Sequence, residues 1–174
     1  MYSQRILDLA RGIIEGEITV AIFDLDKTLW THEDVSSMHP PFRKIDKYKV
    51  VDSRGDIIVL YHCVEDLLKF LREKNLKIAV ASWNIFDKAY QALQTFDLTE
   101  YFDYFVIEFH PHKEEMIEKI KRKFNVDVSK MIFFDDNPEI IDRVLRFHSD
   151  INIVRIGKDI DNICDFYDIL VKVL

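Results

Sequence analysis

The stretch ITVAIFDLDKT, residues 18–28, joins a nearly unbroken run of apolar and β-branched residues to two aspartates. The apolar part, residues 18–23, predicts a strand that is buried on both faces. Asp is common where strands turn, so Asp24 and Asp26 could simply end this strand. The alternative is that both carboxylates are there for chemistry, in which case matching groups should follow the other strands.

Four more apolar runs follow along the chain, and each is preceded by a segment with helical spacing. The predicted strands cover residues 76–81, 104–107, 131–134 and 151–156. The predicted helices cover residues 64–74, 85–95, 113–124, 138–147 and 160–173, with an N-terminal helix over 2–15. This alternation predicts an α/β fold with a parallel sheet and helices on both of its faces.

Residues 31–61 interrupt the alternation. Residues 31–46 look irregular around His39-Pro40-Pro41, and the apolar segments 47–51 and 56–61 flank a turn sequence, which predicts a β-hairpin. With 174 residues and no linker or internal repeat, we predict one domain over 1–174. Its N-terminal helix lies within 1–16, and 31–61 forms a loop and hairpin flap.

Composition narrows the possible functions. The net charge of −7 argues against a basic nucleic-acid-binding surface and requires any phosphate site to bring its own local positive charge. Only four glycines occur, and their spacing excludes a GxGxxG loop and a P-loop. Cys63 and Cys164 have no metal-binding spacing, so we expect reduced thiols. No signal-peptide pattern or membrane-spanning run is present, and we expect a cytoplasmic protein with no membrane partner.

Polar side chains follow four of the five predicted strands, where parallel α/β sheets bind their ligands. In chain order these are Asp24 and Asp26; Ser82, Trp83 and Asn84; His110, His112 and Lys113; and Asp135 and Asp136. Four carboxylates at one sheet edge repel one another strongly unless a cation joins them. Oxygen ligands alone indicate Mg²⁺.

The same groups suit phosphoryl transfer. An aspartate can attack phosphorus and form an aspartyl-phosphate, and Lys113 and the Ser82 hydroxyl could neutralise the transferred group. Asn84 could cap the helix over 85–95, with Asp87 completing a capping box, and so provide an anion site.

Each group also has a structural interpretation. Asp135-Asp136-Asn137-Pro138 is a good start for a helix, and Ser82 alone would be a turn residue. Lys113 could be a surface lysine, although a cation at a helix N-terminus is disfavoured, and His110 and His112 could be structural. The four groups follow successive strands, and this conjunction favours chemistry.

DLDKT, ASWN, HPHK and FFDDNPE resemble the four motifs of the haloacid dehalogenase (HAD) superfamily of aspartate-nucleophile phosphatases. FDLDKTLW, HPPF and MIFFDD are similar to its magnesium-dependent phosphatase branch. The resemblance covers about residues 18–160. It implies a three-layer Rossmann-like fold with a five-stranded parallel sheet in the order 3-2-1-4-5.

The resemblance also implies a role for each matching residue. Asp24 would be the nucleophile and a Mg²⁺ ligand, and Asp26 the general acid and base, with its backbone carbonyl on the metal. Thr28 would order the loop that carries both. Asp136 would bind Mg²⁺ directly, and Asp135 would lie in or near the metal site.

Other residues would bind the phosphate. The resemblance implies hydrogen bonds from Ser82 and from the backbone of Leu25 and Trp83, an ion pair with Lys113, and a place for Asn84 beside them. Two departures from the branch concern the substrate. Trp83-Asn84 stands where Arg-Thr is common, and Lys27 replaces an aromatic residue.

Only about 50 residues separate the first two motifs, so no large cap domain fits between them. An open site admits a phosphorylated protein side chain as well as a sugar phosphate. Aromatic and histidine side chains could line its mouth, although ordinary packing explains them equally well. They are Trp30, His32, Phe42, Tyr48 and Trp83.

We therefore expect a Mg²⁺-dependent phosphatase of phosphate monoesters, with a phosphorylated small molecule or phosphoprotein as substrate. A phosphotransferase or phosphomutase would use the same residues. A receiver domain would need an Asp after the third parallel strand, where this chain offers Glu108. A non-catalytic module should lack the nucleophile or the lysine, and both are present. Dehalogenation is disfavoured, because that reaction would need neither Asp26 nor the metal-binding pair of aspartates.

Overall fold

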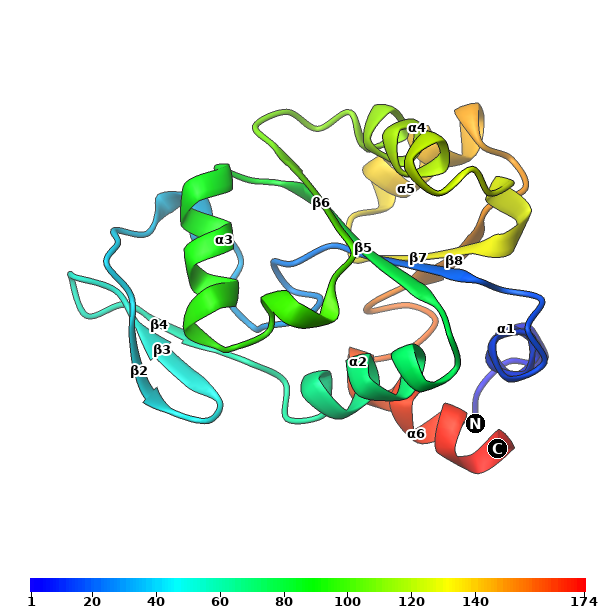
Figure 1. Cartoon of the computed structure of the whole chain (residues 1–174), viewed down its shortest axis with the longest axis horizontal. Helices are drawn as coiled ribbons and strands as arrows, with labels where there is room; N and C mark the ends of the chain where they lie inside the picture. The colour runs from blue at the N-terminus through cyan, green and yellow to red at the C-terminus, as the bar shows by residue number, and fades with distance from the viewer.

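The computed structural model describes all residues from 1 to 174 and has a five-stranded parallel sheet at its centre (Figure 1). The strands are β1 (Val20–Phe23), β5 (Lys77–Trp83), β6 (Tyr104–Glu108), β7 (Met131–Asp135) and β8 (Asn152–Arg155). Their spatial order is β6-β5-β1-β7-β8. Counting the parallel strands along the chain, this is the predicted order 3-2-1-4-5, and the α/β fold class is confirmed.

Helices cover both faces of the sheet. They are α1 (Gln4–Ile14), α2 (Val64–Glu73), α3 (Phe86–Thr95), α4 (Lys113–Phe124), α5 (Pro138–Phe147) and α6 (Ile163–Val173). In Figure 1, α4 and α5 lie above the sheet, and α1, α2 and α6 lie below it. Short 3₁₀ turns connect some elements: η1 (Val35–Ser37), η2 (Thr99–Tyr101) and η3 (Val128–Lys130).

The central strand β1 contributes to two separate hydrophobic cores because successive side chains of a strand point to opposite faces. Val20 and Ile22 pack with residues of α4 and α5. Ala21 and Phe23 pack with residues of α1, α2, α3 and α6. All four side chains are buried, which explains why the sequence of this strand is apolar without alternation.

The segment between β1 and α2 is more ordered than the sequence indicates. The predicted hairpin is present as β3 (Lys49–Val51) and β4 (Ile57–Val59). The expectation of an irregular segment over 31–46 is wrong, because it contains η1 and a third antiparallel strand, β2 (Arg43–Asp46), which pairs with β3. All four residues of β2 are exposed, so no apolar pattern marks it as a strand. The resulting three-stranded sheet, β2-β3-β4, is called the flap below.

The expectation of reduced thiols is also wrong, because Cys63 and Cys164 form a disulfide. Cys63 immediately precedes α2, and Cys164 lies in the first turn of α6. These helices cover the same face of the sheet, which brings together two residues that are 101 positions apart. The structure contains no helix that is long and apolar enough to cross a membrane.

Candidate active site

Asp24 is the first residue after β1, at the edge where β1, β5 and β7 end side by side. Its N–H donates to the carbonyl of Phe134 (3.0 Å), which continues the sheet pairing one residue past the strand. Its carboxylate accepts hydrogen bonds from Lys113 Nζ on Oδ1 (2.8 Å) and from the Thr28 hydroxyl on Oδ2 (3.4 Å). Asp24 is only 6% exposed. The strand therefore places a nearly buried carboxylate at the ligand-binding edge of the sheet.

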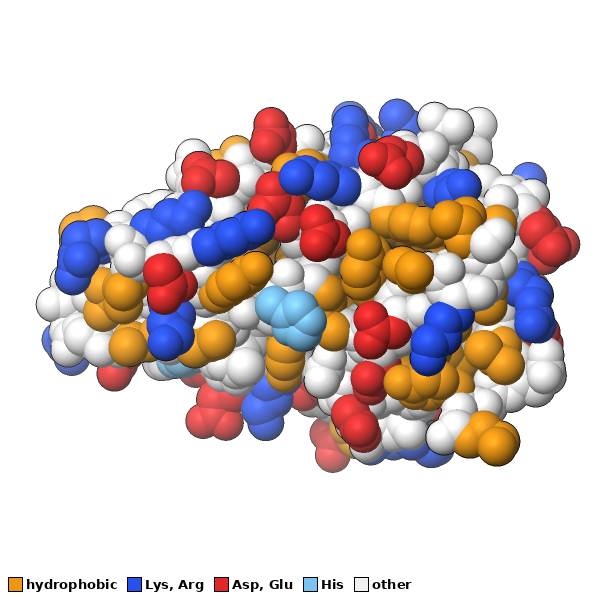
Figure 2. Space-filling view, turned by 90° about the horizontal axis from the view of Figure 1, so that it is seen from below, with side chains coloured by type: hydrophobic (Ala, Val, Ile, Leu, Met, Phe, Trp, Pro, Cys, Tyr) orange, Lys and Arg blue, Asp and Glu red, His pale blue; other side chains and the backbone are white.

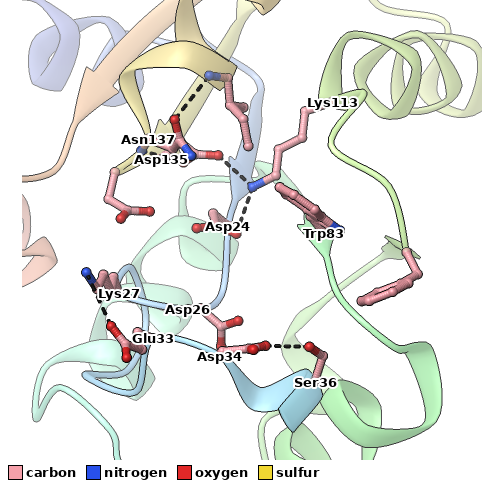
Figure 3. A pocket seen from close by; sticks show the side chains of 13 residues that line it. Asp24, Asp26, Lys27, Glu33, Asp34, Ser36, Trp83, Lys113, Asp135 and Asn137 are labelled. Atoms are coloured by element: carbon pink, nitrogen blue, oxygen red, sulfur yellow. Dashed lines mark hydrogen bonds and ion pairs between the residues drawn. The ribbon is translucent and has the colours of Figure 1, made fainter.

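Lys113 is the first residue of α4 and reaches the same point from above the sheet (Figure 3). Its Nζ lies 2.8 Å from Asp24 Oδ1 and 2.6 Å from Asp135 Oδ2, and the residue is 2% exposed. Burial by itself would lower the pKa of Lys113, but the charges of Asp135 and Asp24 outweigh it and raise that pKa. The ammonium thus stays charged between two carboxylates, although the helix dipole opposes a cation there.

Three aspartates lie close enough to share a metal ion. One carboxylate oxygen from each of Asp24, Asp135 and Asp136 falls within 4.8 Å of the others. Burial and the neighbouring charge of Asp135 raise the pKa of Asp24, against the opposing effect of Lys113, and they raise the pKa of Asp136 as well. One lysine therefore does not neutralise this group of carboxylates. Oxygen ligands with excess negative charge fit a hard divalent cation such as Mg²⁺.

Asp135 differs from Asp24 and Asp136 because both of its oxygens accept short hydrogen bonds, whereas Asp24 Oδ2 accepts only the long one from Thr28. Oδ2 accepts from Lys113, and Oδ1 accepts from the N–H of Asn137 at 2.9 Å. The Asn137 side chain in turn caps α5 by accepting from the N–H groups of Glu139 and Ile140. Asp135 thus anchors Lys113 and the start of α5, which leaves Asp24 and Asp136 better suited to direct metal binding.

Asp26 is held by a different set of donors. Its carboxylate accepts from Trp30 Nε1 (2.8 Å), Asn84 Nδ2 (3.0 Å) and the N–H of Val35 (3.3 Å). Burial raises the pKa of Asp26, and the hydrogen bonds from Trp30 and Val35 oppose this without cancelling it. Lys27 makes the turn possible by adopting a left-handed conformation (φ 59°). The result is an oriented carboxyl group that takes up a proton more readily than an exposed aspartate.

These contacts correct two predictions. Asn84 does not cap α3, because the N-cap position belongs to Ile85 and has no side-chain cap. The Asn84 amide instead bridges β5 to Asp26. Trp30 does not line the mouth of the site, because it is fully buried and uses its indole N–H to hold Asp26.

Hydrogen-bond donors without partners occur near Asp24. Ser82, on β5, is 1% exposed, and its buried Oγ has no hydrogen-bond partner in the protein. The backbone N–H groups of Leu25 and Asp26 donate no hydrogen bond to the protein either. Buried polar groups are rarely left unpaired, so these donors indicate where a polar ligand would bind.

A cavity of about 540 Å³ opens over these groups. Of the predicted site residues, its wall contains Asp24, Asp26, Trp83, Lys113, Asp135 and Asp136. The predicted residues Leu25, Thr28, Ser82 and Asn84 are buried and are not part of that wall.

Aromatic side chains of the cavity were only partly predicted. Trp83 lines the wall, whereas His32, Phe42 and Tyr48 do not. Phe109 was missed and is 67% exposed at the cavity. The sequence does contain a signal for Phe109: it is an apolar residue directly after a strand end, between Glu108 and His110.

The histidines near Lys113 do not reach the cavity. His110 bonds to Glu108, which also pairs with Lys119, and the His110 ring accepts from the N–H of His112. Glu108 is therefore occupied outside the site and does not take the place of a receiver domain's phospho-accepting Asp.

The sequence matches the model of the acid phosphatase family over residues 18–159. The chain belongs to the acid phosphatase family. The family assignment predicted from the four motifs is thereby confirmed.

A human relative of this chain is called Magnesium-dependent phosphatase 1. It is 38% identical over 119 residues, which are 67% of this chain and 66% of the human protein. The match thus spans slightly less than two thirds of that relative's length. Its name agrees with the metal predicted here.

Solved structures share the fold at lower identity. A HAD-superfamily hydrolase from Ehrlichia chaffeensis has a TM-score of 0.66 at 16% identity, over 90% of this chain and 97% of that chain. The N-terminal part of a Bacteroides fragilis protein, which contains a phosphatase domain and was solved with Mg, has a TM-score of 0.63 at 21% identity. It is matched over 92% of this chain and 42% of that chain. The predicted HAD fold is therefore confirmed.

Proposed function

We propose that this protein hydrolyses phosphate monoesters in a Mg²⁺-dependent reaction through an aspartyl-phosphate on Asp24. The observation that carries the proposal is the pairing of Asp24 with a buried lysine, Lys113, beside two further carboxylates and a cavity. Family membership and the names of the relatives support the same reaction class.

In this proposal, one Asp24 oxygen attacks phosphorus and the bond to the leaving oxygen breaks. Asp26 gives its proton to that leaving oxygen, and burial favours the protonated form that this step requires. Asp26 then takes a proton from the water that attacks the phosphorus of the aspartyl-phosphate. Inorganic phosphate leaves, and Asp24 and Asp26 return to their starting forms.

Lys113 and the unpaired donors would stabilise the transferred phosphoryl group. Lys113 offers a positive charge, the Ser82 hydroxyl offers a hydrogen bond, and the N–H groups of Leu25 and Asp26 and the backbone of Trp83 offer others. Asp24 and Asp136, with the Asp26 carbonyl, would hold Mg²⁺. When bound, that ion supplies positive charge against the oxygens of the phosphoryl group.

The substrates we propose are a phosphorylated protein side chain, such as phosphotyrosine, or a sugar phosphate. The open cavity and its exposed aromatic residues, Trp83 and Phe109, support an ester with a sizeable alcohol part. A phosphotransferase would use the same residues and would transfer phosphate to an added alcohol faster than to water.

Hydrolysis of 4-nitrophenyl phosphate tests the reaction class. We expect activity with Mg²⁺, its loss in EDTA and its recovery when Mg²⁺ is restored. Asp24→Asn should abolish turnover, whereas Asp8→Asn, an exposed change on α1, should not affect it. Turnover that survives EDTA, or that survives Asp24→Asn, would refute the proposal.

A further inference from the structure

The cavity has two chemically different ends (Figure 3). At one end lie Asp24, Lys113 and Asp135, which belong to the proposed phosphate and metal site. At the other lie Asp34 and Ser36, with Glu33 nearby, and Asp26 lies between the two ends. Because Asp26 would protonate the leaving oxygen, the alcohol part of a substrate should face the second end.

The segment that forms the second end is held in place. Its centre, Val35, is buried and donates its N–H to Asp26. The N–H of Asp34 donates to His32 Nδ1 (3.0 Å), and Lys88 from α3 donates to the carbonyl of Ser36 (2.8 Å). The Ser36 hydroxyl also donates to the Asp34 carboxylate. The segment that orients the proposed general acid therefore also presents its own carboxylates to the cavity.

The second end is short of positive charge. The cavity wall contains two cationic side chains, Lys113 and Lys27. Lys113 is already shared by two carboxylates, and Lys27 Nζ lies 3.9 Å from Glu33. The Glu33 carboxylate offsets the positive charge of Lys27. Asp34 forms no ion pair with a lysine or arginine. An additional anion on the leaving group would meet carboxylates without a free cation.

We propose that Glu33 and Asp34 select the leaving group by charge, favouring a cationic alcohol over a neutral one and a neutral one over an anionic one. Trp83 and Phe109, which are 45% and 67% exposed, offer an apolar surface for an aromatic leaving group. The inference rests on the proposed function, because it concerns the substrate of the same site.

Three aryl phosphates test this inference directly. The phosphate esters of tyramine, tyrosol and 4-hydroxyphenylacetate carry an ammonium, a hydroxyl and a carboxylate on otherwise similar phenols. We expect kcat/KM to fall in that order, by at least about tenfold from the first ester to the last, equivalent to about 1.4 kcal/mol. We expect 0.5 M NaCl to reduce the ratio of kcat/KM between the first and the last ester, because exposed charges are screened by salt.

The double variant Glu33→Gln/Asp34→Asn should bring the ratio to within about threefold, since it removes both carboxylates and frees Lys27. Glu73→Gln, an exposed change at the end of α2, is the matched control and should keep the ratio. Equal kcat/KM for the three esters in the wild-type protein, or an unchanged ratio in the double variant, would overturn the inference. If 4-nitrophenyl phosphate is hydrolysed but none of the three esters is, the inference alone fails. If none of the four compounds is hydrolysed, the proposed function fails and the inference fails with it.

Discussion

Lys113 shows how one residue can serve both the folded state and the reaction. It is buried with two carboxylates, and without it Asp24 and Asp135 would carry negative charge close together with little solvent. The ammonium that would bind a phosphate is therefore also the group that offsets the repulsion between these two carboxylates in the folded protein. A residue with both functions should affect stability and activity together when it is replaced.

Lys113→Met keeps most of the side-chain volume and removes the charge. We expect the free energy of unfolding at pH 7 to fall by about 3–5 kcal/mol, the usual cost of leaving a buried charge unpaired, and phosphatase activity to be lost. Urea unfolding measures the first effect. Lys119→Met is the matched control: this half-exposed lysine on α4 also pairs with a carboxylate, Glu108, and its loss should cost less than about 1 kcal/mol. Equal losses of unfolding free energy in the two variants would contradict the role given to Lys113.

Trp30 is a positioning residue for Asp26. Trp30→Phe removes the 2.8 Å hydrogen bond to Asp26 and keeps an aromatic ring in the core. We expect kcat to fall by about tenfold with little change in KM, because Asp26 would be less well oriented for proton transfer. Steady-state kinetics separates the two constants. Trp83→Phe, the same change at the cavity wall, should act mainly on KM, and the reverse pattern would contradict both roles.

At the scale of elements, the flap depends on one buried aspartate. Asp52 lies in the turn between β3 and β4, and its carboxylate accepts from the N–H groups of His39 (2.9 Å), Arg54 (3.0 Å) and Asp56 (2.8 Å). Burial works to raise the pKa of Asp52, but these three hydrogen bonds outweigh it and lower that pKa. The carboxylate thus ties the segment before β2 to the turn of the hairpin.

Asp52→Ala should lower the free energy of unfolding by about 1–3 kcal/mol at pH 7, since three backbone donors lose their acceptor. The folded-state pKa is lower than the unfolded one, so this contribution is fully present above about pH 4. It disappears as the pH falls through the folded-state pKa. Urea unfolding should show a smaller difference in unfolding free energy between the wild-type protein and the variant at pH 3 than at pH 7. Asp56→Ala, at an exposed side chain of the same turn, should stay within about 0.5 kcal/mol at both pH values.

At the scale of the whole molecule, the Cys63–Cys164 disulfide joins α2 to α6 beneath the sheet. It closes a loop with a sequence separation of 101 residues. In the chain-entropy description, closing a loop of that length lowers the entropy of the unfolded chain. This stabilises the folded protein by about 4–5 kcal/mol.

Cys63→Ser/Cys164→Ser should therefore unfold at a lower temperature than the wild-type protein. The wild-type protein should shift to the same temperature in a reducing agent, while the double variant should not respond to it. Thermal scans with and without reductant measure this. A wild-type protein that does not respond would indicate that the disulfide contributes little to stability.

The sequence predicted the parts of this molecule that depend on local pattern. Apolar runs identify the parallel strands because both faces of the sheet are buried, and strand ends locate Asp24, Lys113 and Asp135. It did not predict β2, whose residues are all exposed, or the disulfide, which depends on how distant helices pack. Nor did it predict that Trp30 and Asn84 hold Asp26, because a side chain's partner is decided by the packing around it.

The disulfide also decides how the molecule would respond to pulling from its two ends. The covalent loop contains β5, β6, β7 and β8, whereas β1, which lies between β5 and β7, is outside it. Only residues 1–62 and 165–174 could be drawn out, to about 250 Å, against about 600 Å for the reduced chain. A pull on the N-terminus would therefore extract the central strand and Asp24 from a core whose other four strands stay within the covalent loop. The measured length of the extended chain would report whether the disulfide is intact.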